Sequence, residues 1–408
     1  MPNISSVSEF LLLAFAETRE LQLLHFALFL GIYLAALLGN GLILSAVACN
    51  HRLHTPMYFF LLNLALLDLG CISTTLPKAM AISLWDTRAI SYQGCAAQVF
   101  FIAFFIGAEY SLLTVMAYDR YVAICKPLHY GSLVGSRACA QMAAAAWGSG
   151  FFHGVLHTAN TFSLPLCHGN AVDQFFCEIP HILKLSCSDA YLREAGLLVV
   201  SACLAFGCFA FIVLSYVQIF RAVLRMPFEQ GRHKAFSTCL PHLAVVSLFL
   251  STGIFAYLKP KSISSPSLDL LVSLLYSVVP PAVNPLIYSM RNQELKQAVR
   301  KLSLSSRLLS SVSSPSLYVQ PGFPRPRCRT RHLLLLNFMR LVIAQLSNLS
   351  RSLCKAFPPS TESTTPPNPL TSPGSSRFLS RLAVAMSPTA GGQCHADESK
   401  TSYCQVLP

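Results

Sequence analysis

The sequence is poor in charged residues. Only 12% of its 408 residues are Asp, Glu, Lys or Arg, whereas about a quarter is usual in soluble domains. Hydrophobic residues make up 53% of the chain, and the mean hydropathy is +0.52. Such a chain cannot cover a water-facing surface, so we expect the lipid bilayer to be its solvent. In a membrane protein the positions of charged residues in the loops matter more than their sum. The formal net charge of +13 therefore does not indicate a nucleic-acid partner, and we expect none.

Further absences exclude other classes of membrane protein. The last apolar segment, between Asp269 and Met290, has no lysine, which excludes a retinal Schiff base. The chain has no internal repeat, no interrupted spans in matching positions and no row of pore-lining charges, which are features of transporters and channels. It also lacks a cluster of catalytic groups, so we expect no enzyme.

Long apolar segments are what the sequence does contain. A helix that spans a bilayer needs about 20 mostly apolar residues. Seven such segments occur, at about residues 23–49, 57–79, 96–121, 139–160, 195–220, 236–258 and 269–290. They predict an all-α membrane protein, a bundle of seven transmembrane helices.

The placement of basic residues predicts the orientation of the bundle. One set of alternate loops is rich in basic residues: Arg52, Lys126, Arg137, Arg221, Arg225, Arg232, Lys234, Arg291, Lys296, Arg300 and Lys301. The opposite loops mix basic with acidic residues. By the positive-inside tendency the first set is cytoplasmic, which predicts that residues 1–22 lie on the outer side of the membrane. We expect this membrane to be the plasma membrane. Asn3 begins a glycosylation sequon that fits this side.

The chain beyond the seventh span changes in character. Residues 291–302 have apolar side chains at helical spacing and a basic opposite face, which predicts a short amphipathic helix on the inner membrane surface. From residue 303 to 408 the sequence is rich in Ser and Pro and predicts a disordered cytoplasmic tail. The membrane domain, which comprises the seven spans and this short helix, is therefore expected at residues 23–302.

Two short motifs carry the strongest functional signal. The run Asp119-Arg120-Tyr121 stands at the inner end of the third span, where a charged pair is tolerated because it lies at the interface. In the seventh span Pro285 removes a helical hydrogen bond and bends the helix. We expect Asn284 to bond the loosened backbone and Tyr288 to move with the bend. These motifs resemble the Asp-Arg-Tyr and Asn-Pro-x-x-Tyr switches of rhodopsin-like G-protein-coupled receptors.

Longer stretches narrow the resemblance. Residues 53–61 open the second span, residues 126–130 follow the third and residues 234–242 open the sixth. They resemble signatures of olfactory receptors of the tetrapod-type class, and of olfactory receptor family fourteen. The resemblance covers residues from about 20 to 302. It implies that a small volatile odorant activates a stimulatory heterotrimeric G protein and raises cyclic AMP, with Arg120, Tyr216 and Tyr288 rearranging. A receptor for a peptide or a lipid is the alternative.

Two acidic residues, Asp68 and Glu109, lie inside the second and third spans at a similar depth. Two carboxylates at one depth suit a hard cation with oxygen ligands, or they share a proton. The resemblance implies a sodium ion that stabilises the inactive state, with Asn284 and Ser111 as helpers. A hydrogen-bonded pair without an ion is the alternative. No other cofactor is expected.

Four cysteines, Cys95, Cys167, Cys177 and Cys187, lie in or beside one predicted extracellular loop. In an oxidising compartment they suggest two disulfides, for which three pairings exist. The resemblance favours Cys95–Cys177, tying the loop to the third span, with Cys167–Cys187 closing the loop. Cys95–Cys187 is the main alternative.

The resemblance places the ligand between the outer halves of spans 3, 5, 6 and 7. The residues that would line this site are Val99, Ile102, Ala103, Ile106, Gly107, Val200, Cys203, Leu204, Thr252, Tyr257, Leu274 and Ser277. No acid occurs in the outer half of the third span, so an amine would lack its usual counter-ion. A largely apolar site with a few hydroxyls predicts a small, largely uncharged ligand.

Overall fold

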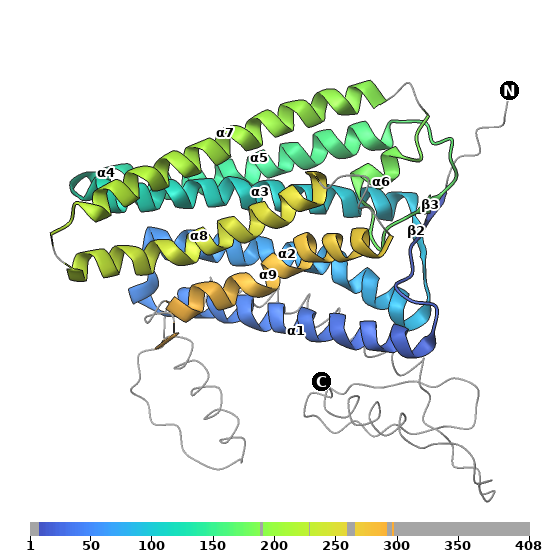
Figure 1. Ribbon diagram of the computed structural model, residues 1–408, viewed down its shortest axis with the longest axis horizontal. Coiled ribbons are helices and arrows are strands. Elements are labelled where there is room, and N and C mark those ends of the chain that lie inside the picture. The colour runs from blue at the N-terminus through green and yellow to red at the C-terminus, as the bar shows by residue number, and fades with distance from the viewer. Residues whose placement is uncertain (1–7, 188–190, 228, 259–265, 292–295, 298–408) are drawn as a thin grey trace, which may run out of the picture. The chain divides into compact units, whose positions relative to one another are not determined.

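A computed structural model describes residues 8–187, 191–227, 229–258, 266–291 and 296–297 of the chain (Figure 1). Asn3, most of the predicted amphipathic helix and the tail from residue 303 lie outside these residues, as does the side chain of Tyr257.

Long helices make up most of the described chain. They are α1 (Arg19–Cys49), α2 (Pro56–Trp85), α3 (Tyr92–Cys125), α5 (Ser136–Phe162), α7 (Tyr191–Leu224), α8 (Glu229–Leu258) and α9 (Pro266–Arg291). Each contains one predicted span and extends past it, because helical hydrogen bonding continues beyond the apolar part. Within the described residues, all but α5 are long and apolar enough to cross a membrane. Helix α5 is less apolar because many of its residues are Ala, Gly, Ser or His rather than Leu, Ile or Phe.

Short helices occupy the connections between the long ones. They are η1 (His51–Leu53), η2 (Pro127–His129), α4 (Tyr130–Leu133) and α6 (Ile179–Leu183). Proline stands in the first turn of α2, η2 and α6, where its missing N–H would have no helical partner and its fixed φ suits the helix.

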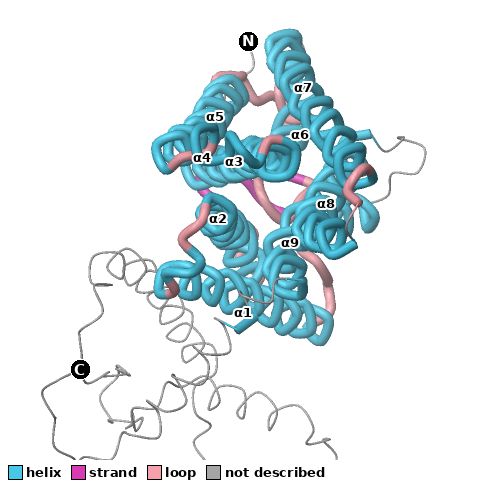
Figure 2. Tube along the Cα trace, turned by 90° about the vertical axis from the view of Figure 1, so that its left-hand side faces the viewer, coloured by secondary structure: helices cyan, strands magenta, loops and turns pink. Residues whose placement is uncertain are grey.

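Helix α3 is central to the bundle, with α2, α5, α7 and α8 packed against it (Figure 2). Its contact with α5 is close because glycine removes the side chain there. A Cβ on Gly150 would come within 2.5 Å of the Phe104 carbonyl oxygen and 2.6 Å of the Ala108 Cβ. Small residues bring helices together in this way in membranes, where packing replaces the hydrophobic effect between helices.

A small sheet lies at one end of the long helices (Figure 1). Its strands are β1 (Glu9–Leu12), β2 (Ala89–Ser91) and β3 (Ala171–Val172), in the order β2-β1-β3. Strand β1 is antiparallel to β2 and parallel to β3. We call this the disulfide end, and the opposite end, which holds α4 and the end of α3, the Arg120 end.

Candidate functional site

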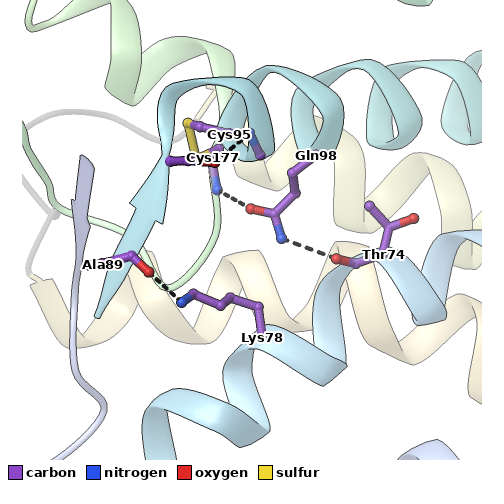
Figure 3. Close-up of a disulfide and its surroundings, with 8 residues drawn as sticks. Thr74, Lys78, Ala89, Cys95, Gln98 and Cys177 are labelled. Atoms are coloured by element: carbon purple, nitrogen blue, oxygen red, sulfur yellow. Dashed lines mark hydrogen bonds between the residues drawn. A yellow bond between two sulfur atoms is a disulfide. The ribbon is translucent and has the colours of Figure 1, made fainter. Parts of the chain in front are cut away.

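The disulfide end carries a cross-linked loop. Cys95, in the first turns of α3, is bonded to Cys177, and Cys167 is bonded to Cys187. This is the pairing that the resemblance favours. Gln98, one turn along α3 from Cys95, makes two further bonds (Figure 3): its Oε1 accepts from the Cys177 N–H at 2.8 Å, and its Nε2 donates to the Thr74 carbonyl at 3.0 Å. The loop is thus fixed to α3, and through Gln98 to α2.

The predicted ligand-lining residues of α3 divide between two environments. Val99, Ile102 and Ala103 are buried, and Val99 belongs to the apolar cluster around the Cys95–Cys177 disulfide. Ile106 and Gly107 are half-buried. A Cβ on Gly107 would meet Gly150 and His153 at 3.4 Å, so this position faces α5.

The predicted ligand-lining residues of α7 do not pack against the buried α3 residues Val99, Ile102 and Ala103. Val200, Cys203 and Leu204 are exposed, Val200 at 57% and Leu204 at 68%. Helix α7 instead turns Ser201 toward α5, where its hydroxyl lies 2.9 Å from His157 Nε2. Val200 and Cys203 point away from Ser201 because successive residues advance by about 100° around a helix, whereas Leu204, three residues after Ser201, lies on the same side and is exposed.

The predicted residues of α8 and α9 make local contacts. The Thr252 hydroxyl is half-buried and donates to the Leu248 carbonyl at 2.8 Å. Ser277 is fully buried, but its hydroxyl donates to the Ser273 carbonyl within α9 at 2.6 Å. The Ser277 carbonyl lies near Cys71 of α2, and Leu274 is half-buried.

Three polar side chains meet in the middle of the bundle. Asp68, Glu109 and Asn284 are each at most 2% exposed. Asn284 Nδ2 lies 3.1 and 3.3 Å from the two Asp68 oxygens and 3.3 Å from Glu109 Oε1. The structure thus brings together the two predicted carboxylates and the predicted amide. Ser111 is not among them: its hydroxyl lies 2.8 Å from that of Ser149, because two residues along a helix turn the side chain to the opposite side, here toward α5.

The same cluster fits a hard cation. The two carboxylates offer four oxygens, the kind of ligand that such ions take. Asn284 Oδ1 is buried and has no hydrogen-bond partner among the described residues, and turning the amide would add it to the set. A group of three or more His, Cys, Asp or Glu side chains arranged for a metal is absent from the described residues, so amide or water oxygens would complete the coordination.

The bend at Pro285 is bonded differently from our expectation. Proline lacks the N–H that would reach the Pro281 carbonyl, four residues earlier. Asn40 of α1, not Asn284, donates to that carbonyl, at 2.9 Å. Asn284 is occupied instead by the two carboxylates. The α9 backbone one turn before Pro285 is therefore bonded to α1.

At the Arg120 end, Arg120 Nη1 lies 3.2 Å from Asp119 Oδ2, and both side chains are buried. The Tyr130 hydroxyl of α4 donates to Asp119 Oδ1 at 2.8 Å. Burial, and then the negative charge of Asp119, raises the pKa of Tyr130 well above its ordinary value. Tyr121 lies apart, half-buried, with the Lys126 ammonium 5.8 Å from its ring centre.

A histidine connects the remaining switch residues. His242 Nε2 lies 3.1 Å from the Leu113 carbonyl oxygen, and its Nδ1 lies 2.8 Å from the Tyr216 hydroxyl. A carbonyl only accepts, so Nε2 carries a hydrogen, and in the neutral imidazole Nδ1 then accepts from Tyr216. His242 thereby joins α3, α7 and α8. Tyr288 is buried nearby in α9, and its hydroxyl has no partner among the described residues.

Comparison with known proteins places the chain. The model of the family described as "Olfactory receptor" matches residues 29–306. Olfactory receptors 14C36 and 14I1 of Homo sapiens are each 49% identical over 302 residues, which cover 74% of this chain and 97% of the relative. Olfactory receptor 10C1 of Homo sapiens is 47% identical over 299 residues, 73% of this chain and 96% of the relative. The chain belongs to the olfactory receptor family.

The resemblance inferred from residues 53–61, 126–130 and 234–242 is thereby confirmed, including the similarity to family fourteen. This olfactory receptor is a multi-pass membrane protein, a seven-helix G-protein-coupled receptor and not an enzyme. Its residues 307–408 lie outside the family match.

Three contacts of this olfactory receptor had not been expected from its sequence. Tyr130 and His242 lie within stretches that carried the resemblance, residues 126–130 and 234–242, so a signal for both was present. The contact of Gln98 with Cys177 had no comparable signal, because a single glutamine in an apolar span does not indicate which carbonyl or N–H it meets.

Proposed function

We propose that this olfactory receptor binds a small, largely uncharged volatile odorant within the bundle, toward the disulfide end. Binding activates a stimulatory heterotrimeric G protein at the Arg120 end and raises cyclic AMP. The receptor lies in the plasma membrane with the disulfide end outside the cell. Disulfides persist in oxidising compartments, and both disulfides lie at the end that the distribution of basic residues also places outside.

The composition of α3 supports the ligand class. Its buried positions toward the disulfide end include Val99, Ile102 and Ala103, and the acid Glu109 is engaged deeper in the bundle by Asn284. An apolar face with isolated polar groups suits a small uncharged molecule better than an amine or a charged peptide.

The observation that carries the proposed mechanism is a pair of buried polar groups without partners. Arg120 Nε and the Tyr288 hydroxyl have no hydrogen bond among the described residues. A buried polar group without a partner costs about 1–3 kcal/mol. An arrangement in which the helix ends separate would give both groups water or G-protein partners. A ligand favours that arrangement only by its differential affinity for the two states.

We also infer that Asp68, Glu109 and Asn284 hold a sodium ion in the inactive state. The ion would neutralise two buried carboxylates that lie against one amide. When the helices rearrange, the same carboxylates would have to separate or take up a proton.

The test is expression of the whole chain in cells with a cyclic-AMP reporter, exposed to a panel of volatile compounds, short peptides and lipids. We expect a saturable rise in cyclic AMP with at least one volatile compound, and none in cells without the receptor. A response to peptides or lipids but to no volatile compound would contradict the proposal and favour the alternative ligand class. Blocking the stimulatory G protein should remove the response.

A further inference from the structure

Strand β1 is the middle strand of the sheet at the disulfide end, and its backbone is bonded on both sides. On the β2 side, the Leu12 N–H donates to the Arg88 carbonyl at 3.0 Å. On the β3 side, the Leu11 N–H donates to the Asn170 carbonyl at 2.9 Å. Strands β2 and β3 do not pair with each other, so the sheet depends on β1.

The side chains of β1 alternate between exposed and buried. Phe10 is fully buried between Tyr92, which begins α3, and Phe162, which ends α5, with ring centres 6.0 and 6.4 Å away. Leu12 is 2% exposed and packs in the cluster around the Cys95–Cys177 disulfide. One strand therefore fastens the loops to two helices.

The chain beyond β1 continues across the bundle. The Leu13 N–H donates to the Gln174 carbonyl at 2.9 Å. The Phe15 ring then lies 4.7 Å from that of Phe29 in α1 and 4.9 Å from that of Phe175. We call residues 9–15 the strap, because they run from the ends of α3 and α5 to α1 over the cross-linked loop.

The loop segment below the strap faces the bundle. Gln174, Phe175 and Phe176 are each at most 1% exposed. Gln174 Nε2 donates to the Ser273 hydroxyl of α9 at 2.6 Å, and the Phe176 ring lies 6.4 Å from that of Tyr276. The disulfide at Cys177 fixes this segment to α3 at one point only, so its path to α1 and α9 depends on noncovalent contacts.

We propose that the strap positions residues 174–178 over the helix bundle and thereby sets ligand affinity, with Phe10 as its positioning residue. Strands of two and three residues, such as β3 and β2, are too short to hold a loop without a third strand. The part of this inference that concerns ligand affinity rests on the proposed function. The part that concerns the loop does not.

A designed disulfide tests the placement of the strap. Leu11 and Ala89 face each other in the antiparallel pair, and both are exposed. The bonds Leu12–Arg88 and Tyr92–Ser8 mark the hydrogen-bonded pairs, so the pair at 11 and 89 is of the other kind, with Cα atoms about 4.5 Å apart. That separation suits a disulfide.

We expect L11C/A89C to form the additional disulfide in cells, seen as a cross-linked peptide by mass spectrometry without reduction. The pair L11C/S91C is out of register, at a diagonal Cα separation of about 7–8 Å, and should remain as thiols. Equal cross-linking of both pairs, or of neither, would overturn the placement of the strap.

A second experiment tests what the strap does. In the purified full chain without odorant, Phe10→Ala should accelerate amide exchange of residues 171–178 by roughly tenfold or more, and leave residues 113–125 unchanged. Leu11→Ala, in the same strand but exposed, is the matched control, and Phe10→Leu should restore much of the protection. Equal exchange in all four proteins would overturn the proposal. If Phe10→Ala does not fold, the L11C/A89C pair decides instead, and unchanged exchange in residues 171–178 of the cross-linked receptor would overturn it.

Signalling then separates the two parts of the inference. With the volatile compound that gives the largest response in the panel, Phe10→Ala should raise the half-maximal concentration and leave the maximal response unchanged at matched surface expression. Faster exchange with an unchanged half-maximal concentration would refute the effect on affinity while retaining the strap. Absence of any active volatile compound would count against the proposed function and leave the exchange result intact.

Discussion

The two ends of the helix bundle are held by different kinds of interaction. The disulfide end has two disulfides, a three-stranded sheet and side chains that bond the loop backbone. Lys78 is an example: its ammonium donates to the Ala89 carbonyl at 2.6 Å (Figure 3) and to the Thr87 carbonyl at 2.9 Å. At the Arg120 end the described residues form no disulfide, and single side-chain contacts join the helices.

This difference indicates which end is built to move. Covalent links and a sheet define one arrangement, because breaking them costs several bonds at once. The Arg120 end holds a buried ion pair and a tyrosine–histidine contact. If the helix ends move, these side chains can exchange one polar partner for another without losing a covalent link. A rigid end and a rearranging end suit the two-state receptor proposed above.

The largest expected effect tests the Arg120 end directly. Arg120→Ala should abolish odorant-stimulated cyclic AMP, a loss of more than about tenfold, because it removes the guanidinium that would exchange Asp119 for the G protein. Surface expression, measured with an antibody against an N-terminal tag, should remain.

Arg88→Ala is the matched control for that substitution. Arg88 also pairs with an aspartate, Asp86, at 2.9 Å, but both side chains are exposed at the disulfide end. An exposed pair contributes little, so signalling should be nearly unchanged. Equal losses in the two variants would mean that the ends do not differ in the way inferred.

The sequence predicted the helices of the bundle well and their contacts less well. Hydropathy located a span inside each long helix, because crossing a bilayer demands a long apolar run. It missed the ends, as at Arg19 and Trp85, where the helix continues into polar surroundings. Strand β1 was not predicted, since its partners lie about 80 and 160 residues away along the chain and short-range pattern carries no information on such pairing.

The polar contacts were predictable in part. A polar site at Asp68 and Glu109 was predicted because carboxylates in a membrane are costly, and the structure brings both residues together at Asn284. Ser111 was placed wrongly because a hydroxyl two residues from Glu109 faces the other side of α3. Val200, Cys203 and Leu204 of α7 are exposed for a similar reason. The sequence located the helix, but it did not indicate which side of the helix faces the bundle.

A smaller effect tests the element that both ends share. Helix α3 contains both Cys95 and Arg120, and its close contact with α5 depends on Gly150. Gly150→Ala should lower the free energy of unfolding by about 1–3 kcal/mol, because the new Cβ would overlap the Phe104 carbonyl and the Ala108 side chain. The measurement is the melting temperature of the detergent-solubilised receptor.

Gly148→Ala is the control for overpacking. A Cβ at that position has nothing within 4 Å, and alanine favours a helix by roughly 1 kcal/mol over glycine, so the melting temperature should hold or rise. A fall of equal size in both variants would mean that the approach of α3 to α5 is looser than the structure has it.

The smallest expected effect concerns the cluster between the two ends. If sodium stabilises the inactive arrangement, replacing external and internal sodium by choline should raise basal cyclic AMP, by about fivefold or less. In the double variant Asp68→Asn/Glu109→Gln, basal cyclic AMP should no longer respond to sodium, because the amides keep the shape of the site and remove its negative charge. Asp86→Asn, an exposed acid at the disulfide end, should keep the wild-type response. Sodium dependence that survives in the double variant would place the ion elsewhere and leave Asp68, Glu109 and Asn284 as a hydrogen-bonded group that joins α2, α3 and α9 without an ion. The difference between the two ends would then remain, but the cluster between them would be a permanent contact rather than one controlled by an ion.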